Sequence, residues 1–575
     1  MAADNLERES HTAEKIADEP KAGSNDLEKS ETESFKQDGV KNVEAVTSVW
    51  SKKALWLTFV MIYVVQFVDM LMQNTQSSLE PYITSSFSKH ALLATTSVMS
   101  SIIGGVSKLT IAKIIDIWGR VEGFGLVIGL LVIGMLMKAL CQNVQTYAAA
   151  AVFYWVGHTG LGYIIDVFVA DMTSLRNRGI MFGLNATPTL ATIFAGPAIA
   201  QAFYTHSNFR WAFGCFCIII PVIAAPIMVS FWMNHRKAKR LGVIAGRNSE
   251  RTWHESIHYY VVQFDVLGML LITAAFALVL LPMSLASSSK DKWASGSMIS
   301  MIVIGVVCFA AFAVWEKRFA PIQFLPWRYL KDRTILGSCI CNFAMFISIY
   351  CWDIYLTSYM QVVNRVNIRD AGYILNSYSL TSSVIMPLCG LLIRYTGRPK
   401  AVALGAVPLA TLGTGLLVYF RHPGSKVGYI TMCQILNGAA GGMLSIAMPL
   451  AVMASVSHQE VAVVLALHGL FASIGAGVGL AVSGAMWTNL LPAALVKYLP
   501  ESHKAEAMTI YGDLTIQLGY EWGSPVREGI IAAYGEVQRK MVIAGACFMP
   551  LLFASIIVWK NHNLKKIEQT RGNVF

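Results

Sequence analysis

The chain has 575 residues, of which 55% are hydrophobic and only 14% are charged, and its formal net charge is +11. Soluble domains carry about 25% charged residues, so this composition excludes an ordinary water-soluble protein and indicates a chain that is embedded mainly in lipid. The positive charge does not indicate a nucleic-acid partner, because no basic stripe alternates with exposed aromatic residues.

Residues 1–50 differ from the rest of the chain. Acidic residues outnumber basic residues there by twelve to six, and Ser, Thr, Lys and Gly fill most of the other positions. Such a segment cannot bury enough apolar surface to fold, so we expect a disordered N-terminal tail. The tail also lacks the apolar stretch of a signal peptide, so we expect the first apolar run to direct insertion.

Apolar runs of about 18 or more residues recur along nearly all of the remaining chain, and each can cross a hydrocarbon core of about 30 Å. Lipid cannot hydrogen-bond to exposed backbone groups, so these runs are expected to be helices. The predicted fold class is therefore an all-α polytopic membrane protein. We count fourteen runs, at about 54–73, 91–112, 123–141, 146–169, 180–203, 211–233, 264–286, 296–315, 335–359, 372–393, 401–420, 428–453, 460–487 and 541–560.

Lys and Arg gather in the loops on one side of these runs. With an even number of crossings both chain ends lie on that side, and the positive-inside rule predicts that both are cytosolic. The predicted organisation is, in chain order, a disordered cytosolic tail 1–50, a six-helix bundle 51–233, a basic cytosolic loop 234–263, two additional helices 264–315, a second six-helix bundle 316–560 that includes a long extracellular loop 488–540, and a cytosolic tail 561–575.

A short motif occurs twice in cytosolic loops. The chain reads AKIIDIWGRVEG after the second run and GLLIRYTGRPK after the tenth, with a charge at the fifth position and Gly-Arg at the eighth and ninth. A glycine-dependent turn whose charges pair with neighbouring helix ends can hold one conformation and release it in another. The predicted cytosolic gate consists of Asp116, Gly119, Arg120, Asp171, Arg176, Arg178, Gly397 and Arg398.

The repeated loop resembles the signature of the major facilitator superfamily, and the resemblance covers about residues 54–560. Fourteen crossings resemble the branch in which two extra helices separate two six-helix bundles. The segment TIFAGPAIAQ keeps the Gly196-Pro197 of the family's antiporter motif but has Ala200-Gln201 in place of two glycines. That departure weakens a drug-exporter interpretation.

Longer strings narrow the resemblance. The segments LEPYITSSFSKHALLATTSVMSSIIGGVSKL, ADMTSLRNRG, YLTSYMQVVN and YEWGSPVREGIIAAYGEVQRKM look like those of fungal siderophore–iron transporters, and they extend from Leu79 to Met541. The chain is similar to the members that carry fusarinine-type ferric siderophores, although no particular residue carries that likeness. The resemblance implies proton symport.

An acidic residue interrupts the first apolar run. On a helix, Gln66, Asp69 and Gln73 lie at i, i+3 and i+7 with Asn74 beside them, so their side chains share a face. An ionised carboxylate in a crossing costs about 2.5–3.5 kcal/mol on insertion scales. We therefore expect this face to border a water-filled cavity in the outer half of the crossing, with Gln66, Gln73 and Asn74 as substrate-binding residues.

Because the resemblance implies proton symport, one titratable group is expected to change its access to solvent during transport. The candidates for proton coupling are Asp69, Asp353 and Asp166, and the sequence does not choose among them. His158 and His468 also lie within apolar runs, and hydrogen-bonded helix packing is the favoured explanation for both.

Aromatic residues crowd the ninth run and the start of the tenth. Part of this pattern is an interfacial aromatic belt, but aromatic faces with hydroxyl and amide groups also suit a bulky ligand with a polar rim. A ferric hydroxamate has this character, and its iron is already wrapped by the chelator. Iron is therefore expected as cargo, with no cofactor and no protein metal ligand. The predicted substrate-binding residues here are Trp352, Tyr355, Tyr359, Asn376 and Tyr378.

The predicted extracellular loop 488–540 is longer than most loops, and loops beyond about 12–15 residues are usually functional or disordered. Its pattern predicts short amphipathic helices with a turn at Gly523-Ser524-Pro525. We expect a lid that helps to enclose the ligand, or alternatively a protective cap. The predicted lid residues are Tyr511, Tyr520, Trp522 and Tyr534.

The first functional hypothesis is proton-coupled import of ferric siderophores by alternating access, by a monomer in the plasma membrane. Cycling of the protein through endosomal vesicles remains open. The alternatives are a proton-antiport exporter of drugs or toxins and a receptor that binds ligand without transporting it. No nucleophile–base set or phosphate-binding loop occurs in the sequence, so an enzyme is not expected.

Overall fold

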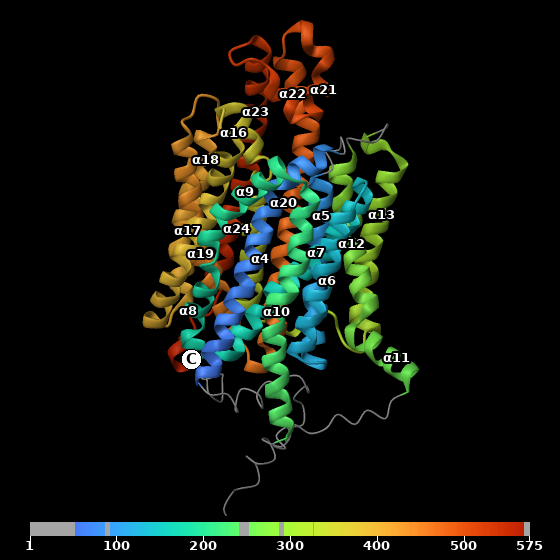
Figure 1. Cartoon of the computed structure of the whole chain (residues 1–575), viewed down its shortest axis with the longest axis vertical. Coiled ribbons are helices and arrows are strands. Elements are labelled where there is room, and N and C mark those ends of the chain that lie inside the picture. The colour runs from blue at the N-terminus through green and yellow to red at the C-terminus, as the bar shows by residue number, and fades with distance from the viewer. Residues whose placement is uncertain (1–51, 87–92, 241–251, 287–291, 326, 568–575) are drawn as a thin grey trace, which may run out of the picture.

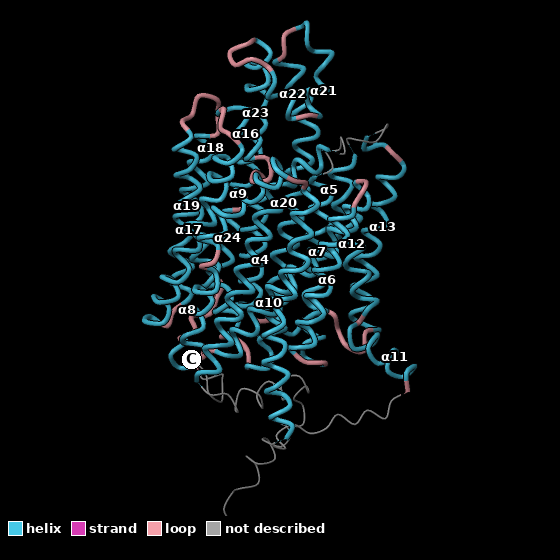
Figure 2. Tube along the Cα trace, in the orientation of Figure 1, coloured by secondary structure: helices cyan, strands magenta, loops and turns pink. Residues whose placement is uncertain are grey.

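The computed structural model describes residues 52–86, 93–240, 252–286, 292–325 and 327–567. The described residues form a tall bundle of helices without strands (Figures 1 and 2). Thirteen of these helices are long and apolar enough to cross a membrane. The predicted tail 1–50 lies outside the described residues, so the prediction of disorder stays untested.

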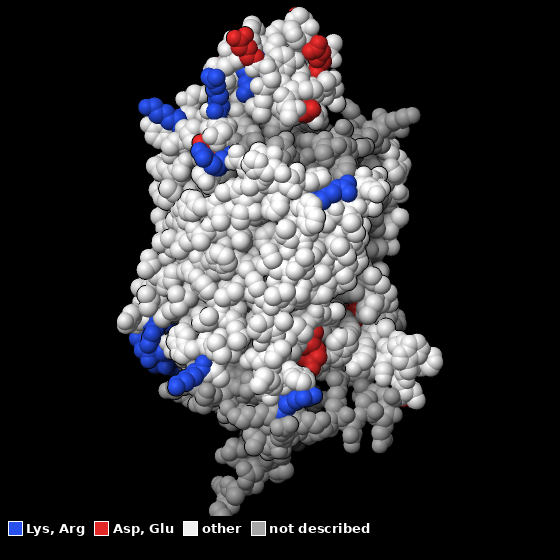
Figure 3. Space-filling view, viewed as in Figure 1, with Lys and Arg blue, Asp and Glu red and all other residues white. Residues whose placement is uncertain are grey.

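The two ends of the bundle differ in the helices that they carry. We call the end at which the first described helix begins the tail face, and the opposite end, which carries the short helices between residues 499 and 524, the cap face (Figure 1). In the view of Figure 3, charged residues gather toward both ends and the belt between them is almost free of charge. Large apolar side chains are exposed on this belt, as Ile218 at 68% and Val222 at 65% illustrate. This is the surface that lipid would cover.

The N-terminal half contains six crossings, one of which is broken. Its helices are α4 (Lys52–Ser86), α5 (Leu93–Ile117), α6 (Arg120–Leu140), α7 (Val144–Met172), α8 (Leu175–Ala186), α9 (Thr189–His206) and α10 (Phe209–Arg240).

The predicted continuous run 180–203 is wrong, because this crossing consists of α8 followed by α9, with a turn at Thr187-Pro188. Thr187 and Pro188 keep helical backbone angles, but proline has no backbone N–H, so the hydrogen bond that Pro188 would donate to the Leu184 carbonyl is missing and the ladder is interrupted. Neither piece counts among the thirteen long helices, and together they supply the fourteenth crossing.

The remaining chain gives the two additional helices and the C-terminal half. The additional helices α12 (Val266–Leu285) and α13 (Gly296–Val314) pack against each other, and α12 contacts α5 and α20. The other helices are α11 (Trp253–Phe264), α14 (Trp327–Leu330), α15 (Arg333–Tyr350), α16 (Leu356–Asn364), α17 (Ile368–Thr396), α18 (Pro399–Phe420), α19 (Val427–Met453), α20 (Val461–Tyr498), α21 (Ala507–Gly512), α22 (Leu514–Gly519), α23 (Pro525–Ala546) and α24 (Met549–Ile557).

One predicted boundary on the cap side is wrong. The ninth run, 335–359, is not one helix, because α15 ends at Tyr350 and the chain turns through residues 351–355 before α16 begins. Within the predicted loop 488–540, α20 continues to Tyr498 and α23 begins at Pro525, so residues 499–524 connect the two long helices. The predicted short helices and the turn are confirmed: Gly523 has a φ of +85° and Ser524 caps α23.

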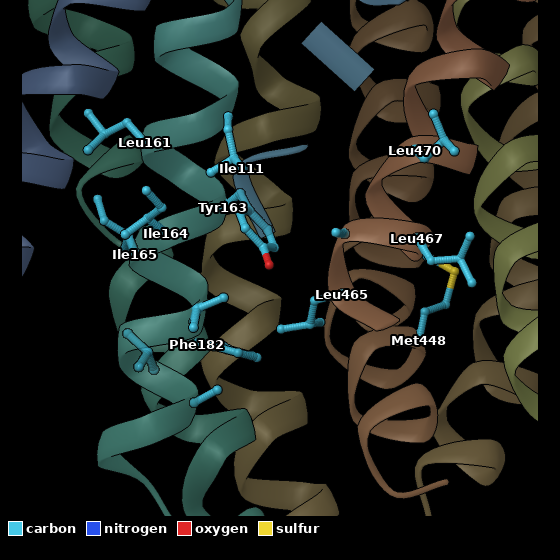
Figure 4. Close-up of a cluster of buried hydrophobic side chains, with 14 of the residues drawn as sticks. Ile111, Leu161, Tyr163, Ile164, Ile165, Phe182, Met448, Leu465, Leu467 and Leu470 are labelled. Atoms are coloured by element: carbon cyan, nitrogen blue, oxygen red, sulfur yellow. The ribbon is translucent and has the colours of Figure 1, made fainter. Parts of the chain in front are cut away.

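The two halves meet along α5–α20 and α8–α17. Figure 4 shows Tyr163 of α7 extending toward α20, which carries Leu465. The Tyr163 hydroxyl donates a hydrogen bond to the Ala462 carbonyl at 2.8 Å. Where α8 crosses α17, a Cβ built on Gly390 would lie 2.5 Å from the Gly179 carbonyl oxygen. Small residues permit such close backbone approach between helices in a membrane.

We predict that Gly390→Val destabilises the contact between the halves. The new side chain would collide with backbone, which cannot move aside as a flexible side chain can, and such overpacking costs about 1–3 kcal/mol. The thermal unfolding temperature of the purified protein in detergent should therefore fall. Gly415→Val is the matched control, because a Cβ on Gly415 in α18 would meet nothing within 4 Å. An equal fall in both variants would contradict the packing argument.

Candidate functional site

A cavity of about 410 Å³ lies between the two halves. Small-molecule sites usually measure about 300–1,000 Å³. Side chains from α4, α5, α7 and α8 line it on the N-terminal side, and side chains from α17, α19 and α20 line it on the C-terminal side. Its polar lining includes Gln66, Asp69, Gln73, Lys108, His158, Thr159, Tyr163, Asp166, Asn185, Ser445 and His468.

Asp69 and His158 form a direct pair on the N-terminal side of the cavity. The Nδ1 atom of His158 lies 2.9 Å from Oδ1 of Asp69, and Asp69 is only 2% exposed. The ring of Tyr154 lies parallel to the imidazole with centroids 5.8 Å apart, and Trp155 meets it edge-on. These contacts fix the orientation of the imidazole. A carboxylate beside a histidine that borders a cavity is an arrangement that can take up and release a proton.

The predicted polar face of α4 is confirmed in part. Gln66, Asp69 and Gln73 line the cavity. Asn74 does not; it donates a hydrogen bond to the Thr192 hydroxyl at 3.1 Å and packs under Gly196 of α9. Asp69 lies at the midpoint of α4, which continues to Ser86, well past the predicted end of the run.

A second charged group lies in the same cavity. Lys108 of α5 and Asp166 of α7 both line it and attract each other, although no ion pair within 4.0 Å joins them in the described part of the chain. Lys108 packs against Gly469, where a Cβ would lie 2.9 Å from its Cδ atom. Asp166 was predicted as a site residue, whereas Lys108 was not. The cavity therefore contains both signs of charge.

The C-terminal side contributes His468, which sequence analysis assigned to packing. Its Nδ1 atom and its carbonyl oxygen both contact the amide nitrogen of Asn342, at 3.3 and 3.2 Å. Its Nε2 atom has no hydrogen-bond partner among the described residues. His468 thus packs as predicted and also borders the cavity.

His158 was missed as a site residue, although the sequence contained a usable signal. His158, Gly162 and Asp166 lie at i, i+4 and i+8 on α7, and all three line the cavity. Residues at this spacing share a helix face. If Asp166 faces a cavity, His158 is therefore expected to face the same cavity. The spacing was visible, but the pairing with Asp69 depends on how α4 and α7 pack.

The predicted aromatic site lies elsewhere. Trp352, Tyr355 and Tyr359 are 1%, 4% and 0% exposed and belong to a hydrophobic cluster on the cap side of the C-terminal half. The Tyr355 ring stacks on Trp487 with centroids 4.0 Å apart. They do not share one helix face, because the chain leaves the helical conformation between Tyr350 and Leu356.

None of the five predicted aromatic and amide residues borders the large cavity. Trp352 and Tyr378 line a separate small space of about 20 Å³, together with Thr414 and Asn437. A space of that size holds about one water molecule. Asn376 is half-buried on α17 and lines neither space. A role in substrate binding for these residues would require another conformation.

Asp353 lies in the turn between α15 and α16, outside the large cavity, and is attracted by Arg421. Arg421 is fully buried, and its charged group lies 5.5 Å from the ring of Trp352 and 5.2 Å from that of Tyr359. Cation–π attraction and the carboxylate offset part of the cost of burying the guanidinium, whose three nitrogens have no hydrogen-bond partner among the described residues. Asp353 is thus attracted by Arg421 outside the large cavity, whereas Asp166 is attracted by Lys108 inside it.

The predicted gate forms a buried ion-pair network on the tail face. Arg120 donates to Asp116 at 2.9 Å and to Asp171 at 3.4 Å, and all three side chains are less than 10% exposed. Gly119 has a φ of +129°, a conformation that favours glycine and allows the turn before α6. His458, from the C-terminal half, places its Nε2 atom 3.6 Å from Asp171. We call Asp116, Arg120 and Asp171 the latch.

Other predicted gate residues behave differently. Arg178 is fully buried, donates hydrogen bonds to the carbonyls of Ala170 and Thr173, and is attracted by the Asp171 carboxylate. Arg176 is exposed. In the second copy of the motif Gly397 has a φ of +73° and accepts a hydrogen bond from the Leu564 backbone N–H, whereas Arg398 is exposed. The repeat preserves the turn and not the ion pairs.

The predicted lid residues belong to a cap anchored on α16 and α23. The Tyr534 hydroxyl donates to Gln517 at 2.6 Å, and Arg527 donates to the Val362 carbonyl at 2.9 Å. Tyr511 and Tyr520 are half-buried, and burial raises the pKa of Tyr511 to about 12, so its hydroxyl stays protonated. Trp522 is 45% exposed. None of these residues borders the large cavity.

Comparisons with known proteins agree with a carrier built from two helical halves around a central cavity. Residues 62–480 match the model of the Major Facilitator Superfamily. The crystal structure of a bacterial homologue of the human lysosomal transporter Spinster, inward-facing and unoccupied, matches with a TM-score of 0.52 at 12% identity, over 89% of this chain and 98% of that one. At that identity the likeness shows the fold alone.

Curated relatives narrow the family. The chain is 50% identical to "MFS siderochrome iron transporter 1" of Ajellomyces capsulatus over 94% of each chain. It is 41% identical to "MFS siderochrome iron transporter D" of Aspergillus fumigatus, over 94% of this chain and 90% of that one. It is 39% identical to "Siderophore iron transporter mirB" of Emericella nidulans, over 94% and 89%. The chain belongs to the major facilitator superfamily and, within it, to the fungal siderophore–iron transporter family.

We predict that Arg120→Ala destabilises the protein by about 3–5 kcal/mol, because it leaves the buried Asp116 and Asp171 without their shared partner. The thermal unfolding temperature in detergent measures this loss. Arg176→Ala is the matched control: it removes an exposed Arg from the same face, and exposed substitutions usually change stability by less than about 0.5 kcal/mol. Similar unfolding temperatures for the two variants would show that the latch contributes little.

Proposed function

We propose that this protein imports ferric siderophore complexes across the plasma membrane by proton-coupled alternating access. The observation that carries the proposal is the Asp69–His158 pair inside a cavity between the two halves of a chain whose relatives are named as siderophore transporters. Iron enters as cargo inside its chelator. Among the described residues no group of three or more His, Cys, Asp or Glu side chains could hold a metal ion.

Alternating access requires contacts that close one side and later open. On the tail face, His458 of the C-terminal half approaches the latch, Tyr163 bonds to Ala462, and the backbones of Gly179 and Gly390 touch. The cavity of about 410 Å³ is small for a wrapped iron chelate. Binding and release would therefore need the halves to move apart, with these contacts breaking when the tail side opens.

Proton coupling is assigned to the Asp69–His158 pair. The two groups lie 2.9 Å apart, so a proton taken up by either one changes the attraction between α4 and α7. Both residues also border the cavity where ligand would bind. Protonation and ligand binding can therefore bias the same helices. Asp353, which is attracted by Arg421 outside the cavity, is the weaker candidate.

The proposal places both termini and the latch in the cytosol and the cap outside the cell, with the protein acting as a monomer. Ferric siderophores of the fusarinine type should be among the substrates tested for uptake. The alternative, a proton-antiport exporter, is supported by Gly196-Pro197. The structure offers a packing reason for that dipeptide, because a Cβ on Gly196 would lie 2.6 Å from the Cβ of Asn74 on α4.

Uptake of iron-55-loaded siderophores by cells that lack other uptake systems tests the function directly. We expect accumulation of one chelate class, and we expect a protonophore to abolish it. Overexpression should confer no drug resistance if the protein is an importer. Surface expression without accumulation of any chelate would contradict the proposal and favour the exporter or a receptor.

A second test separates coupling from binding. Asp69→Asn should abolish concentrative uptake but retain exchange of labelled for unlabelled chelate across vesicles, because exchange needs binding and movement without net proton transfer. His158→Gln should behave similarly, and Asp353→Asn is the control for a carboxylate outside the cavity. Normal protonophore-sensitive uptake by Asp69→Asn would overturn the role of Asp69. Loss of exchange as well would assign Asp69 to binding or folding.

A further inference from the structure

The helix α11 lies outside the helical bundle, at the tail face beside the foot of α12 (Figure 1). None of its residues is buried. Its start is well defined, because Thr252 and Glu255 form a reciprocal capping box. A helix of this kind, with little cover from protein, needs another partner to hold it in place.

Five apolar residues of α11 form a stripe. Trp253, Ile257, Tyr260, Val261 and Phe264 lie at i, i+4, i+7, i+8 and i+11, which is the spacing of one face of an amphipathic helix. The other side carries the exposed polar residues Glu255 and His258 together with the half-buried Val262, and the exposed His254 lies at the edge of the stripe.

Within the described part of the chain, two residues of this stripe pack on protein. Tyr260 and Phe264 meet the ring of Trp118 edge-on, with centroids 5.6 and 6.3 Å apart. The other three residues are open: Trp253 is 72% exposed, Ile257 45% and Val261 46%. Trp118 directly follows the tail-face end of α5, so the stripe side of α11 faces that end of the bundle.

The angle between α11 and α12 is fixed by a buried corner residue. Asp265 has a φ of 45°, is 4% exposed, and accepts hydrogen bonds from the Gly268 N–H at 3.1 Å and from the Trp315 indole N–H at 2.8 Å. Directly beyond it, Leu267 and Leu270 of α12 are 45% and 56% exposed. The open stripe on α11 therefore continues into the exposed apolar surface of a membrane-crossing helix.

We infer that α11 is a membrane-interface helix: lipid covers Trp253, Ile257 and Val261, and the rest of the same stripe holds Trp118. A helix with one apolar and one polar face lies in the plane of the interface, with its apolar side among the upper acyl chains. Trp118 stands between Asp116 and Arg120 in the chain. The lipid surface thereby braces the turn that carries the latch.

Spin labels on the reconstituted full-length protein test the inference. Ile257→Cys reports on the apolar stripe and His258→Cys on the polar side, in phosphatidylcholine vesicles. The parent protein labelled in parallel gives the background from its native cysteines. We expect power saturation to show the label at 257 several-fold more accessible to oxygen than to an aqueous nickel complex, and the reverse at 258. These readings do not depend on transport.

Two outcomes would overturn the inference. Equal access of the nickel complex to both labels would place the stripe in water. Protection of the label at 257 from both reagents would mean that protein, such as a second copy of the chain, covers it. A further variant checks the cause: in a Trp253→Ser, Ile257→Asn background, a label at Val261→Cys should become several-fold more accessible to nickel than in the otherwise unchanged protein.

Discussion

The cost of a charged side chain among membrane-crossing helices is the constraint on which the rest of this structure depends. Such a charge costs several kcal/mol unless it meets water, a partner or both. Asp69 lies against His158 and borders the cavity, whereas Arg120 lies between Asp116 and Asp171 on the tail face. Arg421 lies beside two aromatic rings and near Asp353. Each of these three arrangements fixes how the neighbouring helices pack.

One helix connects the two charged sites. His158 and Asp166 of α7 line the cavity, and Asp171 near its end belongs to the latch. From residue 158 to residue 171 a helix rises by about 20 Å, at 1.5 Å per residue. A change in the attraction between Asp69 and His158 therefore acts on the same rigid element that carries a latch carboxylate. This is a physical route by which protonation in the cavity can reach the tail face.

The two halves are related without being equivalent. Both copies of the repeated motif keep a glycine with positive φ. Within the described residues, Arg120 of the first copy forms ion pairs and the arginines of the second copy form none, whereas Gly397 of the second copy accepts a backbone hydrogen bond from Leu564. The cavity is likewise asymmetric. Its acidic groups come from α4 and α7, and the C-terminal half contributes His468 and Ser445. In the proposed mechanism both coupling groups, Asp69 and His158, therefore belong to the N-terminal half.

The sequence by itself determined the fold class, the two extra helices, the polar face of Gln66, Asp69 and Gln73, and the latch, because these depend on hydrophobicity, helical spacing and a local turn. Tertiary structure decided the rest. Only the packing of α4 on α7 brings His158 to Asp69, and only the break after Tyr350 turns Trp352, Tyr355 and Tyr359 into a buried cluster. A periodicity argument assumes a continuous helix and cannot see which neighbour a face will meet.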